Sequence, residues 1–288
     1  MNNRILKELE IYLSKSDNQK SSHWKKELQG ADYFNTHKSF GFGWFEKKST
    51  LHIPIHFFFQ KLIFDNKIFS TDEYKMFKKL CDLQNRQIEC DVIRHIFTFN
   101  FLNKHNLLKN KICVIGDGKA NFVGGLLQNN RKDIKIFSIN LAEVLIHDYL
   151  LIKITNLIKD EDIVVVKSKK DLSIPNKRLF LIDASNSSLL INKNINLFIN
   201  IASMQEMKPE IIENYFQIIK SNSAYFYCCN REYKKLYGNE ELIFDQYPWG
   251  NCKKIVLEDC PWHKKYYDFK RPFIKKYDGN VKHSLVKY

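Results

Sequence analysis

The chain has 288 residues, 44% of them hydrophobic and 14% aromatic, which is enough apolar sequence to bury a substantial core and excludes a mainly disordered protein. Lys and Arg together outnumber Asp and Glu by 46 to 32, a formal charge of +14 that by itself would suggest an anionic partner. Most of this excess is typical of an AT-rich genome, because 39 of the basic residues are Lys and the chain also holds 32 Ile and 27 Asn.

The N-terminal part, residues 1–108, is expected to form a helical lobe. One helix is predicted over Asp72–Leu80, with Ser70 or Thr71 as its N-cap, because the apolar residues of this segment fall on one face. Apolar residues at helical spacing predict a second helix over Ile88–Phe101. Two aromatic stretches are expected to be loop or short strand: Phe40–Phe45 and Leu51–His56.

Neither a signal peptide nor a membrane-spanning segment is expected. The first twenty residues are charged throughout, and no apolar run approaches the roughly 18–20 residues that cross a bilayer. The seven cysteines are odd in number and form no CxxC pair, so neither a disulfide framework nor a zinc ribbon is indicated. We expect a cytoplasmic protein with reduced thiols.

From residue 109 to 288 the pattern changes to short β-branched runs that alternate with helices. Such runs indicate an α/β fold with a mostly parallel sheet covered on both faces. The expected strands are Ile112–Ile115, Ile134–Ile139, Ile163–Val166, Leu179–Ile182, Asn196–Ile201 and Ala224–Cys229. The expected helices are Asn121–Asn130, Ala142–Leu157 and Pro209–Lys220. Two later runs, Leu242–Phe244 and Lys254–Leu257, are expected to close the sheet as an antiparallel pair.

A glycine turn follows the first of these strands. Gly116-Asp117-Gly118 allows a tight turn and lets the backbone approach a ligand at the start of the next helix. The third glycine of the dinucleotide fingerprint is absent, since Lys119-Ala120 follows. A shorter turn of this kind suits S-adenosylmethionine, which has no pyrophosphate. A plain strand-to-helix connection is the alternative interpretation.

Polar residues follow two further strands. Asn140 ends the second strand, where an adenosine ligand needs a hydrogen-bonding partner for its ribose. Asp183 follows a later strand and could accept from an adenine amino group, or it could cap a turn. Because the carboxyl ends of parallel strands share one edge of the sheet, we expect these residues to converge with the glycine turn.

Several segments resemble the bacterial putative sugar O-methyltransferases. These are the "S-M-Q-E-M" segment within Asn200–Phe216, the run Asn140–Leu150, the segments Tyr227–Arg231 and Asp245–Trp249, and the early Ser22-His23-Trp24. The resemblance covers about residues 20–262. It implies a Rossmann-like class I methyltransferase core, mostly parallel with antiparallel closing strands, behind the helical lobe. The implied reaction is methylation of a sugar hydroxyl in a surface polysaccharide or its nucleotide-linked precursor, with S-adenosylmethionine as the cofactor.

The chain departs from this family at two points. Asn140 stands where the family has Asp, and Lys119-Ala120 replaces a glycine-rich continuation. A degenerate binding paralogue is therefore one alternative, and an RNA methyltransferase that uses the basic surface is another. We expect cofactor contacts from Gly116, Asp117, Gly118, Asn140, Leu141, Asp183, Ala184, Asn200 and Ser203.

Two residues are candidates for the chemistry. Methyl transfer to a hydroxyl needs alignment of the two groups and a base for the proton. Glu206 follows the fourth core strand and is the first candidate, with a helix first-turn acid as the alternative. His263 is the second candidate, with an exposed loop histidine as the alternative.

Aromatic loops supply candidates for the acceptor site. Trp44, Tyr247 and Trp249 could stack on a sugar, although such aromatics are often core residues. No metal site is expected, since no acidic cluster stands at a strand end. Arg86 and Arg94 could clamp a phosphate, although solvated helix charges are the favoured interpretation.

The C-terminal residues 262–288 concentrate the positive charge, with eight basic and two acidic side chains. Their first part interleaves Lys264, Lys265, Lys270, Arg271, Lys275 and Lys276 with aromatic residues. We interpret this stretch as a basic tail that contacts an anionic glycan or membrane surface, and we expect its deletion to leave cofactor binding intact. The expected partner is a small-molecule or glycan acceptor rather than a specific nucleic acid.

Overall fold

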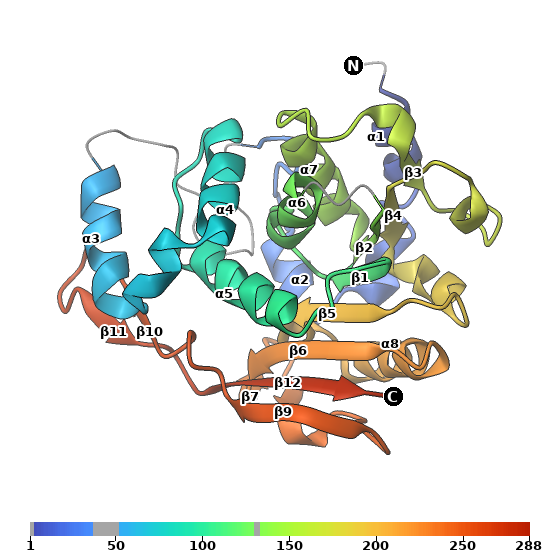
Figure 1. Ribbon diagram of the computed structural model, residues 1–288. Coiled ribbons are helices and arrows are strands. Elements are labelled where there is room, and N and C mark those ends of the chain that lie inside the picture. The colour runs from blue at the N-terminus through green and yellow to red at the C-terminus, as the bar shows by residue number, and fades with distance from the viewer. Residues whose placement is uncertain (1–2, 37–51, 130–132) are drawn as a thin grey trace.

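A computed structural model describes residues 3–36, 52–129 and 133–288 (Figure 1). Before the sheet come the helices α1 (Arg4–Glu10), α2 (Ser22–Glu27), α3 (Ile53–Ile63), α4 (Asp72–Leu83) and α5 (Cys90–Lys104). The next part holds β1 (Lys111–Ile115), α6 (Asn121–Gln128), β2 (Lys135–Asn140), α7 (Ala142–Lys153), β3 (Ile163–Val165), β4 (Leu179–Asp183), β5 (Leu197–Ile201), α8 (Pro209–Ser221) and β6 (Tyr225–Arg231). The last part holds β7 (Tyr233–Lys235), β8 (Glu241–Ile243), β9 (Lys253–Asp259), β10 (Lys265–Tyr267), β11 (Ile274–Lys276) and β12 (Val281–Lys287).

One eight-stranded sheet organises the molecule, in the order β3-β4-β2-β1-β5-β6-β12-β9. The strands from β3 to β6 pair in parallel, whereas β12 runs antiparallel to both β6 and β9. The order reverses between β1 and β5, which is the switch point of a doubly wound sheet. The expected Rossmann-like α/β fold, a mostly parallel sheet with antiparallel closing strands, is confirmed.

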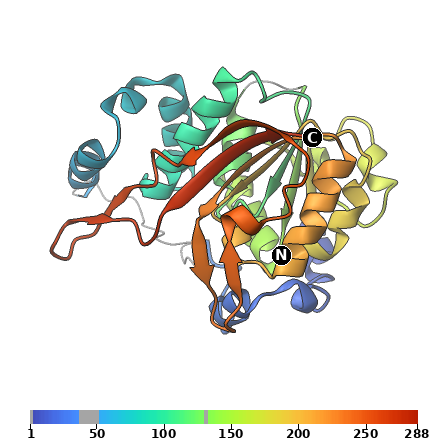
Figure 2. The same cartoon turned by 90° about the horizontal axis from the view of Figure 1, so that it is seen from below.

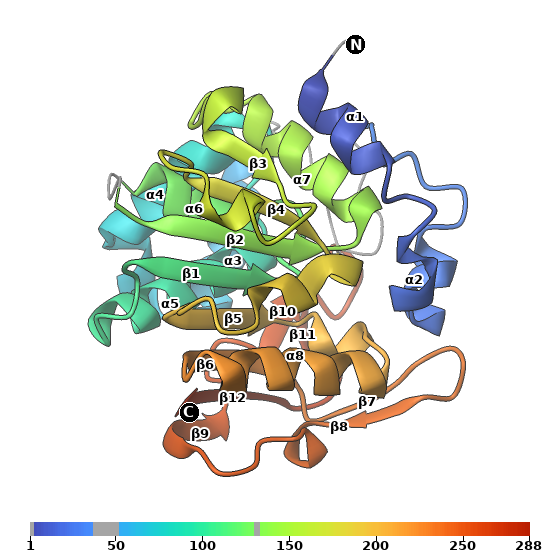
Figure 3. The ribbon, with the colours of Figure 1, turned by 90° about the vertical axis from the view of Figure 1, so that its right-hand side faces the viewer.

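Helices cover both faces of this sheet (Figure 3). Apolar residues of α1 and of α4 to α7 form one core with one face of the strands, and α8 forms a second core with the other face. The first core is one cluster whose members come from both ends of the chain, and it includes Ile5 and Leu285, which are both fully buried. Helices α1, α4 and α5 thus share one core with the sheet.

The helix predictions in the N-terminal part are confirmed for α4 and α5. Thr71 caps α4, since its hydroxyl accepts from the backbone N–H of Tyr74. The extended structure expected for Leu51–His56 is wrong, because α3 begins at Ile53 with a proline in its first turn, where a missing N–H costs nothing. The stretch Phe40–Phe45, with Trp44, lies outside the described residues.

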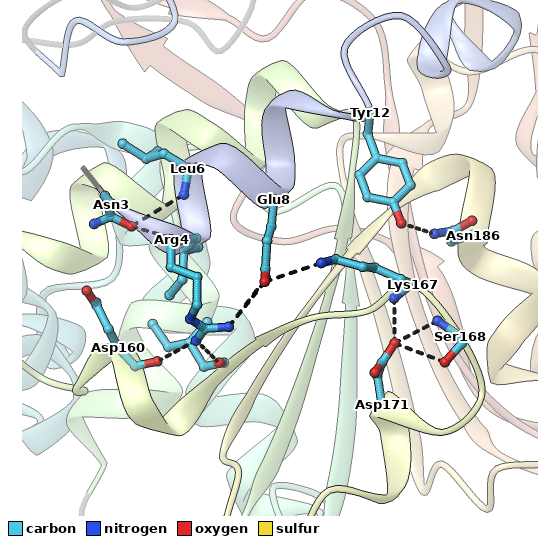
Figure 4. A network of polar contacts seen from close by, with 12 residues as sticks. Asn3, Arg4, Leu6, Glu8, Tyr12, Asp160, Lys167, Ser168, Asp171 and Asn186 are labelled. Atoms are coloured by element: carbon cyan, nitrogen blue, oxygen red, sulfur yellow. Dashed lines mark hydrogen bonds and ion pairs between the residues drawn. The ribbon is translucent and has the colours of Figure 1, made fainter. Parts of the chain in front are cut away.

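Polar contacts fasten α1 to the loops around β3 (Figure 4). The Arg4 guanidinium donates to the backbone carbonyls of Asp160 and Ile163, each at 3.4 Å. Glu8 forms an ion pair of 3.2 Å with Lys167. Exposed pairs of this kind contribute little free energy of folding, so buried Ile5, Leu6 and Leu9 account for most of the attachment.

The closing strands differ from the prediction. The segment Leu242–Phe244 contributes to β8, which pairs with β7, and Lys254–Leu257 lies in β9, which pairs with β12. The two runs therefore do not pair with each other. The partner of β9 comes from the very end of the chain.

This arrangement also corrects the interpretation of residues 262–288 as a tail. Strand β12 lies between β6 and β9, with Leu285 and Val286 fully buried. The six basic residues singled out above lie instead around the β10–β11 hairpin, which packs on α3 at the side of the molecule (Figure 2). Deleting the whole segment would remove a strand from the sheet. Within the described part of the chain, no helix is long and apolar enough to cross a bilayer.

Candidate functional site

A cavity of about 200 Å³ lies at the carboxyl ends of the parallel strands, beside the switch point between β1 and β5. Open α/β sheets bind their ligands at this position. Predicted residues that line it are Gly116, Asp117, Gly118, Asn140, Ser203, Glu206 and His263. The convergence expected from the strand ends is therefore seen for the glycine turn, Asn140 and the loop after β5.

The glycine turn has an unusual backbone. Gly116 and Gly118 have φ values of +70° and +56°, and Lys119 and Ala120 also have positive φ, at 57° and 50°. The loop after β5 lies so close that a Cβ on Gly116 would stand 1.8 Å from the Ser203 Oγ. A glycine is thus required at position 116, because the backbone there has a positive φ and because Ser203 leaves no room for a side chain.

Two buried ion pairs hold this strained turn. The Lys119 ammonium lies 2.8 Å from the Glu89 carboxylate, and the Arg86 guanidinium lies 3.5 Å from the same group. Arg86 also donates to the side chain of Asn121, at the first position of α6. Arg86 and Lys119 are each 1% exposed, so the interpretation of Arg86 as a solvated helix charge is wrong. Its partners show a role in fixing the turn.

Asp117 caps the following helix. Its two carboxylate oxygens accept from the backbone N–H groups of Phe122 and Val123, each at 2.8 Å. Burial raises the pKa of Asp117 to about 7, although these hydrogen bonds act in the opposite direction. Both oxygens of the Asp117 carboxylate are therefore engaged with the protein backbone. A ligand in the cavity would contact the backbone of the turn instead.

Asp148 of α7 is a site residue that the sequence interpretation missed. Its carboxylate accepts from the Ala120 N–H at 2.8 Å and from the Asn140 amide at 3.4 Å. It thereby joins the glycine turn to the end of β2. Burial and the nearby Asp117 raise the pKa of Asp148 well above its usual range. The sequence signal was a carboxylate in the middle of a mostly apolar helix.

The residues at the predicted adenine end of the site differ from those expected. Asp183 does not line the cavity, and one of its oxygens accepts from the backbone N–H of Ser185 at 3.0 Å, as a helix cap does. Leu141 and Ala184 form a small buried cluster with Trp24 of α2. Trp24 itself lines the cavity, so α2 covers this end of the site.

The loop after β5 contributes Asn200 and Ser203 in different ways. Asn200 is fully buried and bridges three elements, donating to the Ile115 carbonyl at 2.9 Å and accepting from Met204 and Asn230. It therefore positions the loop and does not line the cavity. Ser203 lines it directly, opposite Gly116.

Glu206 lies on the cavity wall with a side chain that is 16% exposed. Burial raises the pKa of Glu206 to about 8, while Lys234 and Arg231 act to lower it. Its carboxylate stands 3.6 Å from the His23 imidazole of α2. A carboxyl group that ionises near pH 8 is suited to accept a proton from a hydroxyl.

His263 also lines the cavity, but its Nδ1 faces two thiols. The Nδ1 atom lies 3.2 Å from the Cys260 sulfur and 3.7 Å from the Cys229 sulfur. His263 is 4% exposed, so it is not the exposed loop histidine of the alternative interpretation. Burial lowers the pKa of His263 well below its usual value.

A second cavity, of about 460 Å³, adjoins the first. Four residues line both: Asp91, Arg94, Arg231 and Tyr277. Both guanidinium groups lie against the Tyr277 ring, with centroid distances of 4.6 Å to Arg94 and 5.1 Å to Arg231. Tyr266 and Tyr267 of the β10–β11 hairpin form a further wall.

The charged groups of this second cavity are held in pairs. Arg94 donates to Asp91 at 2.7 Å and Arg231 donates to Asp278 at 2.7 Å. The Nε of each arginine is buried without a hydrogen-bond partner among the described residues. Arg94 is 4% exposed, so its interpretation as a solvated helix charge is also wrong.

The predicted aromatic walls lie elsewhere. Tyr247 and Trp249 pack against Phe216 of α8, on the other face of the sheet, and neither lines the two cavities. They are core residues, as the alternative interpretation held. The tyrosines of the second cavity were missed because the hairpin that carries them approaches the site only through tertiary packing.

Comparisons with known proteins give structural likeness alone. No family model matches the sequence, and no curated protein matches it either. An S-adenosylmethionine-dependent methyltransferase from Clostridium acetobutylicum shares 13% identity at a TM-score of 0.41, over 83% of this chain and 99% of that one. One from Aquifex aeolicus shares 11% identity at a TM-score of 0.38, over 79% and 95%. The methyltransferase domain of bacterial CtHen1 shares 12% identity at a TM-score of 0.40, over 68% and 97%. At such low identities and TM-scores these likenesses carry no inference about function.

Proposed function

We propose that this chain is an S-adenosylmethionine-dependent methyltransferase that methylates a sugar hydroxyl. The observation that carries the proposal is the pair of adjoining cavities at the switch point of the sheet. One contains the glycine turn with Asn140 and Ser203, and the other is walled by tyrosines and paired charges. A cofactor and an acceptor can therefore meet at the residues that both cavities share.

The polar groups that line the first cavity suit S-adenosylmethionine. The left-handed turn at Gly116 and Gly118 leaves its backbone close to the cavity, and Asn140 offers an amide near the expected ribose position. Trp24 offers an aromatic wall for the adenine. S-adenosylmethionine, when bound, supplies a methyl group on a sulfonium, and the protein's task is to align an oxygen with it and to remove a proton.

The second cavity fits a sugar. Tyr266, Tyr267 and Tyr277 present rings on which the apolar face of a sugar can stack. Asp91, beside Arg94, offers a carboxylate for hydroxyl groups at the junction of the two cavities. Aromatic walls with a few convergent polar groups are the usual composition of a small-ligand site.

Glu206 is the proposed general base. It lines the cavity that holds the turn, and it follows β5 at the edge where the reacting methyl would lie. Because its pKa is raised to about 8, its ionised form retains a strong affinity for a proton. We also propose a cytoplasmic location, supported by seven cysteines that all lie as free thiols.

Calorimetry with S-adenosylmethionine and S-adenosylhomocysteine tests the cofactor. We expect one binding site per chain, and no heat at millimolar ligand would overturn the proposal and favour a degenerate binding paralogue. Transfer of a labelled methyl group then tests the acceptor, with nucleotide-linked sugars and RNA compared at two salt concentrations. Label in RNA alone would favour the RNA methyltransferase instead.

A further inference from the structure

The three side chains of Cys229, Cys260 and His263 form a cluster that the proposed reaction does not use. Their ligand atoms all lie within 4.8 Å of one another, and all three residues are buried. Cys229 comes from β6, whereas Cys260 and His263 lie in a turn after β9. Residues distant in the sequence therefore direct two sulfurs and one nitrogen at a single point.

Hydrogen bonds link parts of this cluster, since the Cys229 thiol is hydrogen-bonded to Cys260 and to Tyr227. The His263 Nδ1 faces the Cys260 sulfur at 3.2 Å and the Cys229 sulfur at 3.7 Å. A ring nitrogen carries either one proton or one lone pair, so it can serve one of these sulfurs well but not both. A cation between the three atoms would satisfy all of them at once.

The distances suit a tetrahedral metal. Zinc binds sulfur at about 2.3 Å and imidazole nitrogen at about 2.0–2.1 Å, which places neighbouring sulfur and nitrogen ligands roughly 3.5 Å apart. The two sulfur–nitrogen distances here lie on either side of that value. Two thiolates also neutralise a divalent cation, so a buried site of this composition would leave no net charge in the core.

The local backbone holds the ligands in place. The N–H of Cys260 donates to the Val281 carbonyl of β12 at 2.7 Å, and the N–H of His263 donates to the Cys260 carbonyl at 3.3 Å. Trp262, between them, stacks on Phe97 of α5 with 5.6 Å between ring centroids. The turn is thus fixed on both sides before any metal binds.

We propose that Cys229, Cys260 and His263 form a zinc site beside the cofactor cavity. Its fourth position is left to water or to the Tyr227 phenol, which neighbours the Cys229 thiol. The metal ties the end of β6 to the turn after β9. It thereby holds His263 at the cavity wall and supports Arg231, two residues after Cys229.

The test is metal binding by the full-length protein, purified under reducing conditions and stripped with a chelator. We expect one equivalent of Co²⁺ to give the thiolate charge-transfer and intense visible bands of tetrahedral coordination, and Zn²⁺ to displace it. Zinc should also raise the melting temperature of the stripped protein, because metal that binds only the folded state stabilises it.

Variants locate the site. Cys260→Ser and Cys229→Ser should each lose the thiolate bands and the zinc-dependent rise in melting temperature. The matched control Cys252→Ser removes a thiol outside the cluster and should keep both. The readout does not involve methyl transfer, so the zinc site and the methyltransferase proposal can fail separately.

Two results would overturn the zinc site. One is a stripped wild-type protein, folded by circular dichroism, that shows no tetrahedral cobalt spectrum. The other is a Cys229–Cys260 disulfide, found by mass spectrometry after alkylation of the protein as isolated without reductant, with no zinc in the same sample. Because both measurements use the wild-type chain, a variant that fails to fold does not decide the matter.

Discussion

The parallel and antiparallel parts of the sheet contribute to the site in different ways. From β1 to β6 the strands alternate with α6, α7 and α8, and their carboxyl ends carry the glycine turn, Asn140 and Ser203. The antiparallel part joins β12 to β6 and β9, and the segments around it supply Tyr266, Tyr267 and Tyr277. The proposed cofactor side is thus built from consecutive strand–helix units, and the proposed acceptor side from segments distant in the sequence.

This difference teaches where each kind of failure should appear. A substitution in the parallel part should weaken cofactor binding and leave the fold intact, because local ion pairs hold the glycine turn in place. A change in the antiparallel part should affect the fold first, because β12 is hydrogen-bonded on both of its edges. The following experiments test that contrast.

Deletion of residues 281–288 should have the largest effect. It removes β12 and opens the core at Leu285 and Val286. Each large apolar side chain lost costs about 2–5 kcal/mol, so the total loss is comparable to a typical stability of about 5–15 kcal/mol. We expect no cooperative thermal unfolding by circular dichroism. The control, Lys270→Gln with Arg271→Gln on the exposed hairpin, should melt like the wild type. A truncated chain that melts cooperatively would contradict the role given to β12.

Glu206→Gln should lower kcat/KM by about 10²–10⁴-fold, the usual contribution of a general base, without changing cofactor affinity. In the wild type kcat/KM should rise with pH up to about 8, as Glu206 ionises, and the variant should lack this rise. The matched control Glu210→Gln changes an exposed acid in the first turn of α8. Equal activity of the Glu206 and Glu210 variants would exclude Glu206 as the base.

Stability gives a second readout for Glu206. Its pKa is higher in the folded protein, about 8, than the ordinary value of 4.5. The folded state therefore binds more protons between these values, and the free energy of unfolding should fall as pH rises from about 4.5 to 8. Denaturant titrations across this range should show a weaker fall in Glu206→Gln. An identical pH dependence in the two proteins would show that folding does not raise the pKa of Glu206.

Gly116→Ala should weaken cofactor binding by roughly 10–100-fold, which corresponds to about 1.4–2.8 kcal/mol. The new Cβ would meet Ser203 and would sit in a left-handed conformation. Calorimetry with S-adenosylhomocysteine measures the loss. Gly279→Ala is the matched control, because Gly279 has a φ of +81° but nothing within 4 Å of its added Cβ. Equal affinities for the two variants would place the cofactor away from the turn.

Trp24→Leu should have the smallest effect, a fall in cofactor affinity of about fivefold, which corresponds to the lower end of the roughly 1–3 kcal/mol that stacking of a base on an aromatic ring contributes. Trp249→Leu is the control, since Trp249 packs on the other face of the sheet and should leave the affinity unchanged. Tighter binding by Trp24→Leu would show that Trp24 obstructs the adenine end of the site.

The sequence by itself determined the parallel sheet and the sheet edge where the proposed cofactor cavity lies. Apolar β-branched runs that alternate with helices leave one compact arrangement, and the polar residues after such strands must meet at one edge. Gly116, Asn140 and Ser203 could be placed for this reason. The partners of the turn could not be placed, because Asp148 lies on helix α7 and Glu89 and Arg86 lie in the segment between α4 and α5. How these parts face the turn is set by tertiary packing.

Only the tertiary structure decided the rest. A basic, aromatic C-terminal segment has the composition of a tail, and nothing local shows that Val281–Lys287 enters the sheet between β6 and β9. The same holds for Cys229, Cys260 and His263, whose spacing in the sequence is not that of a metal motif. Pairing of distant strands depends on which edges remain open after the other strands have paired. The sequence alone therefore located the cavity at the switch point, whereas the tyrosine-lined second cavity and the thiol–imidazole cluster depended on how the last strand closed the sheet.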